Sequence, residues 1–244
     1  MDREYAEEYA TLYRQHWWWR ARERLIADEV GRLLRPDGSA RILDVGCGAG
    51  LLFETLTPFG RVQGVEHDPA IAAQAGALNA RIWVGPFDET FQPGHRFDLV
   101  IMADVLEHLE DPAAALRKAA SLLAEEGHIV ITVPAFRWLW TLHDRINGHQ
   151  TRYSAPELAA LVGAAGLEPG RLRYFFGWLV LPKLVVRLRE RVLRPEPGVP
   201  AIPAPWINRM LVHVSRFENR CFGDRLPGGS SLLLVCAPPP PGRR

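Results

Sequence analysis

Residues 41–50 read RILDVGCGAG, and this stretch decides the fold. A short apolar run passes directly into Gly46, Gly48 and Gly50. Such a run predicts a buried parallel strand that ends in a tight turn, where residues without a Cβ fit best. The residues that follow, LLFETL, can open a helix. A strand, a glycine-rich turn and a helix in this order let backbone N–H groups approach a nucleotide-like ligand closely.

Two carboxylates indicate which ligand this is. A second apolar run, Val62–Val65, ends in Glu66, and an acid at the tip of the second strand can accept hydrogen bonds from ribose hydroxyls. The glycines follow the pattern G-x-G-x-G, whereas the dinucleotide fingerprint is G-x-G-x-x-G. Asp44, next to the turn, disfavours a pyrophosphate and suits a cationic ligand. We therefore predict S-adenosylmethionine (SAM), which carries a sulfonium, and keep a nicotinamide-dependent oxidoreductase as the rival.

Four motifs carry a resemblance to a known family. They are LDVGCGAG at 43–50, VEHD at 65–68, FDLVIMADVLEHLEDP at 97–112 and LLAEEGHIVITVPAF at 122–136. In combination they resemble class I SAM-dependent methyltransferases. The chain is most similar to the ubiquinone-biosynthesis type of O-methyltransferase and to bacterial methyltransferases of polysaccharide or lipid-sugar pathways. Segments like 16–22 and 143–153 recur in those relatives.

Alternating apolar runs and helical stretches predict an α/β fold with a largely parallel sheet and helices on both faces. We expect strands at 41–45, 62–66, 81–84, 97–102, 128–133, 171–176 and 230–236, and helices at 4–34, 50–57, 69–77, 111–124 and 155–165. The resemblance implies a Rossmann-like sheet of seven strands in the order 3-2-1-4-5-7-6, with the seventh strand reversed.

The chain divides into five expected parts. Residues 1–38 form an N-terminal helical lid, 39–176 the SAM-binding Rossmann-like domain, 177–229 a helical insertion between strands six and seven, 230–237 the last strand, and 238–244 a disordered tail. The insertion is apolar and then strongly basic. Either it is a cap that packs on the domain, or residues 174–194 lie on an anionic membrane surface.

Composition limits the functions that remain. The 244 residues carry a net charge of +1, which gives no support for nucleic-acid binding. We expect no signal peptide, because the N-terminus is charged and polar, and no apolar run approaches the roughly 20 residues that span a bilayer. Three cysteines far apart predict neither a disulfide framework nor a zinc site, so no metal is expected. We expect a cytoplasmic protein, with peripheral contact on the inner membrane face as the alternative.

The cofactor residues are expected at the carboxyl ends of the strands. Asp68 is interpreted as a helix N-cap and Cys47 as a small residue that fills the turn. After the third strand, relatives often place an aspartate directly behind the glycine, but Pro86 stands there. Adenine contact then falls to Asp88 or Phe87, unless Asp88 is a plain loop residue. The full set is Asp44, Gly46, Cys47, Gly48, Gly50, Glu66, His67, Phe87, Asp88, Met102 and Ala103.

The acceptor residues are expected around the same crevice. Methyl transfer to a hydroxyl requires alignment and a base, and a histidine suits that role. The candidates are His143 and His149, in a loop that follows the fifth strand; a purely structural role for both is the alternative. Glu107 is expected to support the loop after the fourth strand. Expected substrate contacts are Trp18, Trp19, Asp104, His108, Arg152 and Tyr153.

The sequence therefore predicts a SAM-dependent methyltransferase that acts at an oxygen of a small-molecule or lipid-linked acceptor. A non-catalytic SAM-binding protein is the second rival, since a chain that has lost its base would keep the same cofactor motifs.

Overall fold

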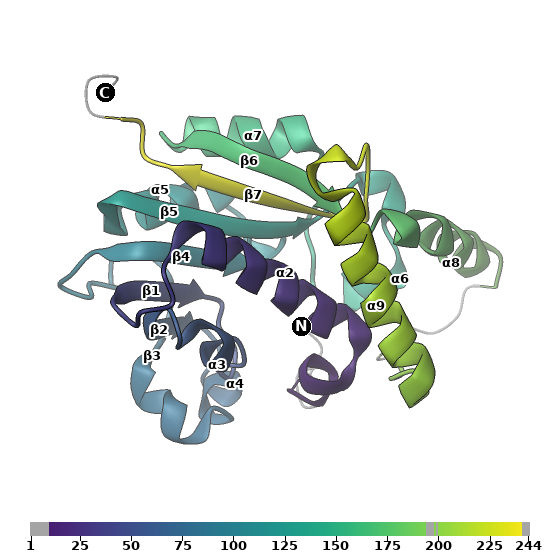
Figure 1. The fold of residues 1–244 in the computed structure, drawn as a ribbon, viewed down its shortest axis with the longest axis horizontal. Helices are drawn as coiled ribbons and strands as arrows, with labels where there is room; N and C mark the ends of the chain where they lie inside the picture. Colours follow the sequence, from purple (N-terminus) through teal and green to yellow (C-terminus); the bar gives the residue numbers. More distant parts are fainter. Residues whose placement is uncertain (1–9, 194–197, 199, 241–244) are drawn as a thin grey trace.

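The computed structural model describes residues 10–193, 198 and 200–240, and a seven-stranded sheet forms its centre (Figure 1). The order is β3-β2-β1-β4-β5-β7-β6. Strand β7 runs antiparallel to both of its neighbours, and the other pairs are parallel. The predicted sheet order and the reversed last strand are confirmed. The strands are β1 (Ala40–Val45), β2 (Gly60–Glu66), β3 (Ile82–Val84), β4 (Phe97–Ala103), β5 (Leu123–Pro134), β6 (Glu168–Phe175) and β7 (Ser231–Ala237).

Helices cover both faces of this sheet, as predicted. On β5, Ile129 and Ile131 belong to one apolar cluster with α5 and α7, whereas Val130 between them belongs to a second cluster with α2, α3 and α9. This alternation follows from the two-residue period of a strand. The α-helices are α2 (Trp17–Leu33), α3 (Phe53–Leu56), α4 (Pro69–Ala73), α5 (Pro112–Leu122), α6 (Leu142–Ile146), α7 (Ala155–Ala164), α8 (Val180–Leu193) and α9 (Pro205–Cys221).

The N-terminal helix differs from the prediction. We expected one helix over 4–34, but residues 10–15 are helical, the helix breaks at His16, and α2 begins at Trp17. His16 has an extended backbone, and its Nδ1 accepts a hydrogen bond from the Trp18 backbone N–H at 3.2 Å. A side chain that caps the next turn in this way starts a new helix. Residues 1–9 of the expected helix lie outside the described part of the chain.

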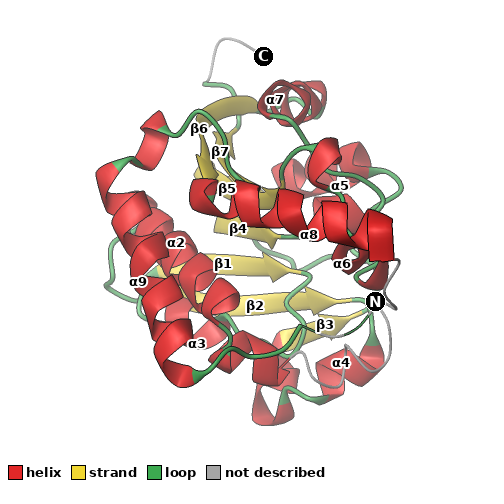
Figure 2. Cartoon of the chain, turned by 90° about the vertical axis from the view of Figure 1, so that its right-hand side faces the viewer, coloured by secondary structure: helices red, strands yellow, loops and turns green. Residues whose placement is uncertain are grey.

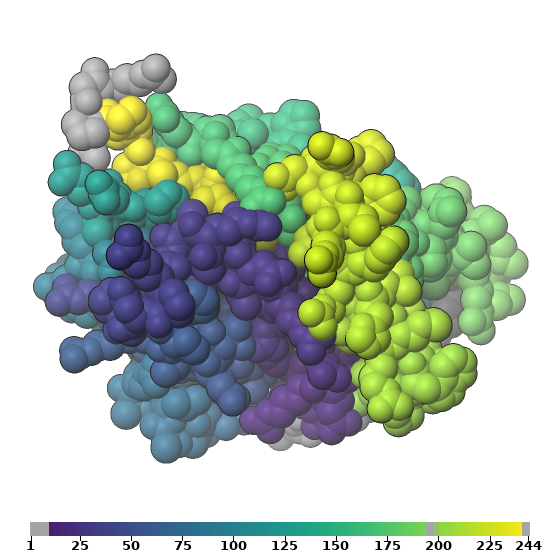
Figure 3. Space-filling view, in the orientation of Figure 1, coloured from purple at the N-terminus to yellow at the C-terminus, as the bar shows by residue number. Residues whose placement is uncertain are grey.

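The predicted insertion between β6 and β7 contains α8 and α9. Helix α9 packs along α2 (Figures 1 and 2), and Asn208 fixes the contact: its Oδ1 accepts from Trp17 N at 2.7 Å and its Nδ2 donates to Gln15 O at 2.6 Å. In the space-filling view the purple N-terminal helix and the yellow-green α9 lie against each other (Figure 3). Within the described residues, no helix is long and apolar enough to cross a membrane.

Helix α8 lies on another side of the molecule, next to α6 (Figures 1 and 2). Glu190 of α8 accepts a hydrogen bond from the Leu142 backbone N–H at 3.0 Å, which fixes α8 to the start of α6. The link between α8 and α9 and the predicted disordered tail fall partly on 194–197, 199 and 241–244, outside the described residues.

Candidate active site

A cavity of about 1110 Å³ lies at the carboxyl ends of the parallel strands. This is the edge at which open α/β sheets bind ligands. We call one part the glycine end and define it by Gly46, Gly48, Glu66 and Phe87, from the ends of β1, β2 and β3. We call the other part the histidine end and define it by Glu107, His108, His143 and His149, from the loops after β4 and β5. The start of α2 and the inner side of α8 also line the cavity.

The glycine end depends on a turn that only glycines form without strain. Gly46 and Gly48 have φ values of +70° and +56°, in the left-handed region. A Cβ on Gly46 would lie 2.8 Å from a methyl carbon of Val105, so space as well as backbone angle excludes a side chain there. Gly46 N donates to Val65 O at 2.8 Å and ties the turn to β2. Backbone therefore lines this part of the cavity closely.

Glu66 lies at the tip of β2 and is buried at the cavity wall. Its two carboxylate oxygens accept backbone N–H groups, Oε2 from Gly48 and Oε1 from Asp68, each at 2.9 Å. These bonds hold the carboxylate against the glycine turn. A carboxylate oxygen has a second lone pair, so both oxygens can still accept from a ligand hydroxyl. The N-cap prediction for Asp68 is confirmed, since its Oδ1 accepts from Ala70 N at 2.8 Å.

The wall between the two ends is built around Asp104, which follows β4. Asp104 has a φ of +56°, a strained backbone for a residue with a side chain, and such strain is typical of functional sites. Its carboxylate forms an ion pair with Arg22 of α2 and accepts from Thr132 Oγ1 at 3.0 Å. The Arg22 guanidinium lies 5.1 Å from the ring of Trp18. A buried polar network thus joins the N-terminal helix to β4.

The loop after β5 is organised by Asp144, whose side chain is wholly buried. Oδ1 accepts from His149 Nδ1 and Arg152 Nε, each at 2.8 Å, and Oδ2 accepts from Arg152 Nη2 at 2.9 Å. Burial favours the neutral acid, but the hydrogen bonds from His149 and the charge of Arg152 outweigh it and hold the pKa of Asp144 well below its usual range. Asp144 is therefore an ionised carboxylate that fixes one nitrogen of His149.

The two candidate histidines differ in their surroundings. His143 Nε2 lies 2.9 Å from Asn147 Nδ2, and burial, followed by the charge of Lys183, lowers the pKa of His143 to about 3. A group with such a low pKa is a poor proton acceptor near neutral pH. His149 lines the cavity with Nδ1 engaged by Asp144, so Nε2 is the nitrogen that Asp144 leaves for a ligand. An imidazole oriented by a buried carboxylate is the usual arrangement of a general base.

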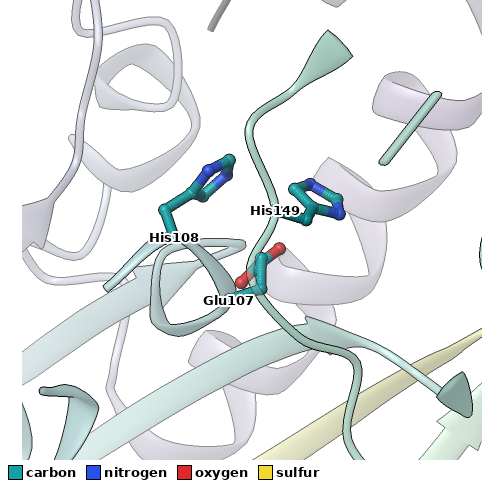
Figure 4. A group of neighbouring side chains, drawn as sticks. All are labelled: Glu107, His108 and His149. Atoms are coloured by element: carbon teal, nitrogen blue, oxygen red, sulfur yellow. The ribbon is translucent and has the colours of Figure 1, made fainter. Parts of the chain in front are cut away.

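Glu107 and His108 lie beside His149 (Figure 4). Neither carboxylate oxygen of Glu107 has a hydrogen-bond partner among the described residues, although its side chain is fully buried at the cavity wall. Burial, followed by the charge of Asp104, raises the pKa of Glu107 well above its usual value. Burial and the neighbouring His149 lower the pKa of His108 to about 4. At the histidine end, a carboxyl without a hydrogen-bond partner among the described residues thus lies beside two of the three imidazoles.

The comparisons with known proteins decide the family. Residues 18–170 match the family described as methyltransferase domain. This chain belongs to that family. A protein named ubiquinone biosynthesis O-methyltransferase from Azorhizobium caulinodans is 34% identical over 58% of this chain and 64% of its own length. One of the same name from Xanthomonas axonopodis pv. citri is 30% identical over 74% of this chain and 73% of its length. The chain thus spans slightly less than two thirds of the Azorhizobium protein.

Among solved structures, a SAM-dependent methyltransferase from Archaeoglobus fulgidus superimposes with a TM-score of 0.54 at 18% identity, over 88% of this chain and 93% of that one. At this identity the likeness concerns the fold. Membership of the methyltransferase family implies SAM as the methyl donor, as the sequence predicts. The nicotinamide-dependent oxidoreductase is therefore the wrong alternative.

Several residues that we expected at the methyltransferase cofactor do not line the cavity. Asp88 is exposed and accepts from Thr90 N at 2.8 Å, which leaves Phe87 as the lining residue after β3. Met102 is fully buried in the apolar core, whereas its neighbour Ala103 lines the cavity. The remaining expected residues that lie behind the lining are Asp44, Cys47 and Gly50. Those that line it are Gly46, Gly48, Glu66, His67, Phe87 and Ala103.

The charge of Asp44 also differs from the prediction. Burial raises its pKa to about 7, with Arg22 opposing and Glu66 reinforcing the shift. The carboxyl is thus only partly ionised at neutral pH, whereas we expected a full carboxylate that attracts the sulfonium. The prediction of SAM was confirmed, but the attraction that we assigned to Asp44 is weaker and acts from behind the turn.

The expected substrate contacts also divide into two groups. Trp18, Trp19, Asp104, His108 and Arg152 line the cavity. Arg152 is only 1% exposed, and its donors bond to Asp144 and to Ala135 O, so its role is to hold the loop. Tyr153 does not line the cavity; its hydroxyl donates to Leu106 O at 3.1 Å, and burial raises its pKa to about 12.

Sequence reasoning missed several lining residues with ionisable side chains, among them Arg22, Glu107, Lys183 and Glu190. Lys183 of α8 faces the cavity, and burial, followed by the charge of Arg152, lowers its pKa to about 8. Glu107 was expected to support the loop rather than to line the cavity. Its position just after the carboxyl end of β4, where ligands bind in this fold, was the available signal.

Proposed function

We propose that this methyltransferase transfers the methyl group of SAM to a hydroxyl oxygen of an acceptor that binds at the histidine end. The observation that carries the proposal is the Asp144–His149 pair in the same cavity as the glycine turn. His149 Nδ1 lies 2.8 Å from a carboxylate that is held ionised, so the proton of the acceptor hydroxyl can pass to Nε2. The resulting imidazolium is stabilised by Asp144.

At the glycine end, we propose that Gly46 and Gly48 contact SAM through backbone atoms and that Glu66 binds the ribose hydroxyls. Phe87 contacts the adenine and Ala103 the region near the sulfonium. All five residues line the cavity, and Glu66 keeps a lone pair on each oxygen for this purpose. With the two ligands at opposite ends, the acceptor oxygen attacks the methyl carbon in line with the carbon–sulfur bond, which breaks toward sulfur.

Isotopically labelled SAM tests this function. The protein is incubated with labelled SAM and either the lipid or the water-soluble fraction of a cell extract, and the product is identified as a methyl ether, amine or carbon-methylated compound. We expect a methyl ether, and we expect His149→Ala to lower its formation by about 10²- to 10⁴-fold, the usual contribution of a general base. His143→Ala is the matched control. Equal losses in both variants, or a product methylated at nitrogen or carbon, would contradict the proposal.

We further propose that the acceptor is lipid-linked. Helix α8 contacts an anionic membrane surface, and the acceptor enters the cavity from that surface. The outer side of this helix carries exposed apolar side chains: Leu181, Val185, Leu188 and Val192 are between 64% and 72% exposed. The inner side, with Lys183 and Val186, lines the cavity. Arg187, Arg189 and Arg191 lie on the same helix, and basic amphipathic helices bind anionic lipid interfaces.

Flotation with vesicles measures this contact. We expect the protein to float with vesicles that contain phosphatidylglycerol, to bind less at high salt, and to lose binding when Leu181 and Val185 are changed to Ser. The control is Ala159→Ser on α7, away from α8. A buried residue such as Leu12 would not serve, because its change to Ser would perturb the core. Retained flotation of the α8 variant would exclude this helix, and a label confined to the water-soluble fraction would exclude a lipid-linked acceptor.

A further inference from the structure

The histidine end contains a feature that base catalysis by His149 does not use. The carboxyl group of Glu107 is fully buried, and neither of its oxygens has a hydrogen-bond partner among the described residues. A buried carboxyl without a partner is costly, because the group has lost its hydrogen bonds to water and gained none in exchange. Because Glu107 lines the cavity, a ligand in the cavity can supply the missing partner.

Two histidines stand next to this carboxyl. Glu107, His108 and His149 each offer one ligand atom, and these three atoms lie within 4.8 Å of one another (Figure 4). The rings of His108 and His149 are 4.8 Å apart between centroids and meet edge to face. Two imidazoles and one carboxylate form a donor set that zinc and other divalent transition metals bind, commonly with further positions left open for a substrate oxygen or water.

The surroundings of the cluster match those of a metal site. His149 already bonds to Asp144 through Nδ1, so Nε2 is the atom available for a metal, and a carboxylate behind a ligating histidine orients the ring and raises its basicity. The backbone holds the three residues together, since Gln150 N donates to Glu107 O at 2.7 Å and Gln150 Nε2 donates to His108 O at 3.0 Å. The loop after β5 is thereby fixed against the loop after β4.

We propose that Glu107, His108 and His149 bind one divalent transition metal ion, with zinc as the best match. This goes against our expectation from the sequence that the chain holds no metal. The 40 residues between His108 and His149 explain why spacing gave no signal. The distances among the ligand atoms require the side chains to close toward the ion, since Zn–N bonds are about 2.0–2.1 Å long.

The consequence for methyl transfer rests on the proposed function. A divalent ion at this point lowers the pKa of an acceptor hydroxyl that binds to it. The proton then leaves to solvent water, the oxygen electron pair forms the bond to the methyl carbon, and the carbon–sulfur bond breaks toward sulfur to leave a neutral thioether. His149 Nε2 would act as a ligand in the metal-bound protein and as the base only without metal.

Metal titration of the full chain tests the site without any acceptor. The protein is freed of metal by dialysis against a chelator and titrated with Zn²⁺ by calorimetry and with Co²⁺ by visible absorption. We expect one equivalent to bind and the ligand-field bands of bound Co²⁺ to appear. We expect Glu107→Gln, His108→Ala and His149→Ala each to weaken binding by at least about 10- to 100-fold. His213→Ala, an exposed histidine on α9, is the matched control.

Binding of S-adenosylhomocysteine to every variant shows that the fold is intact, because its site lies at the glycine end. Absence of Zn²⁺ and Co²⁺ binding, or unchanged binding in Glu107→Gln and His108→Ala, would overturn the metal site. The outcome is separable from the proposed function. One bound metal without methyl transfer to any extract fraction would leave the site standing and remove the function. Methyl ether formation by protein that binds no metal would leave the proposed function standing and remove the metal site.

Discussion

Replacement of Asp144 by Asn perturbs the group on which the histidine end depends. The carboxylate is wholly buried and accepts from both Arg152 Nε and Nη2 and from His149 Nδ1. Asparagine has nearly the same shape, but it has no charge, and its amide nitrogen is a donor. In either orientation this donor faces another donor, and the Arg152 guanidinium, which is 1% exposed, loses its counter-charge.

The expected loss of stability follows from the burial of this pair. Removing one partner of a buried ion pair costs about 3–5 kcal/mol, because the remaining charge is left uncompensated. That is a large part of the roughly 5–15 kcal/mol by which domains are stable. Urea-induced unfolding of Asp144→Asn measures the loss. Glu125→Gln, which removes an exposed carboxylate on β5, is the control and should change the free energy of unfolding by no more than about 0.5 kcal/mol.

The pH dependence supplies an independent check on the same carboxylate. Burial opposes ionisation, but His149 and Arg152 hold the pKa of Asp144 below its usual value. A depressed pKa means that the carboxylate stabilises the fold fully above the unfolded-state pKa of about 3.9 and loses this effect as the pH falls below it. The difference in stability between wild type and Asp144→Asn should be constant from about pH 5 to 7 and should shrink below about pH 4. A difference of less than about 1 kcal/mol at pH 7, or one that is unchanged at pH 3, would refute this account of the loop.

Three further changes test other parts of the molecule. Glu66→Ala should weaken SAM binding by about 10- to 100-fold in calorimetry, since charge-assisted hydrogen bonds contribute about 1.5–3 kcal/mol; unchanged affinity would remove Glu66 from the site. The pKa of Asp44 is raised to about 7, so this group is mostly neutral at pH 6 and ionised at pH 8. SAM is a cation and should therefore bind more tightly at pH 8 than at pH 6. An equal change of affinity with pH in Asp44→Asn would show that another group causes it. Gly64→Ala places a Cβ 2.4 Å from Cys47 Sγ, so thermal unfolding should show a loss of about 1–3 kcal/mol, and an unchanged melting temperature would contradict this packing.

The sheet could be predicted because its strands are apolar runs bounded by glycine and proline. The errors lie where a strand continues through polar residues. Strand β5 begins at Leu123, although we expected it at residue 128, because the exposed Glu125 and Glu126 interrupt the apolar run. The break at His16 was equally invisible in the sequence, since the tryptophans that follow fit a continuous helix and only the side chain of His16 as a cap separates the two parts.

The glycine end was predicted better than the histidine end, for a geometric reason. Its residues follow the strands directly, and their location is set by the strand order. The errors there concern how close a residue lies to the end of its strand: Val45 and Ala103, the last residues of β1 and β4, line the cavity, whereas Asp44 and Met102, one position earlier, lie behind it. Val45 and Met102 are register partners on neighbouring strands and share a face, so the position along the strand, and not the face, separates a lining residue from a core residue.

The histidine end instead brings together parts of the chain that no local pattern connects. Arg22 of α2 reaches Asp104 after β4, and Gln150 after β5 holds the backbone of Glu107 and His108. Each of these contacts is polar and directional, so each fixes a geometry rather than merely adding apolar area. Helices α2 and α8, which lie outside the sheet, complete this end. Acceptor choice can therefore change through these added elements while the glycine turn and Glu66, fixed by the sheet itself, go on binding the same methyl donor.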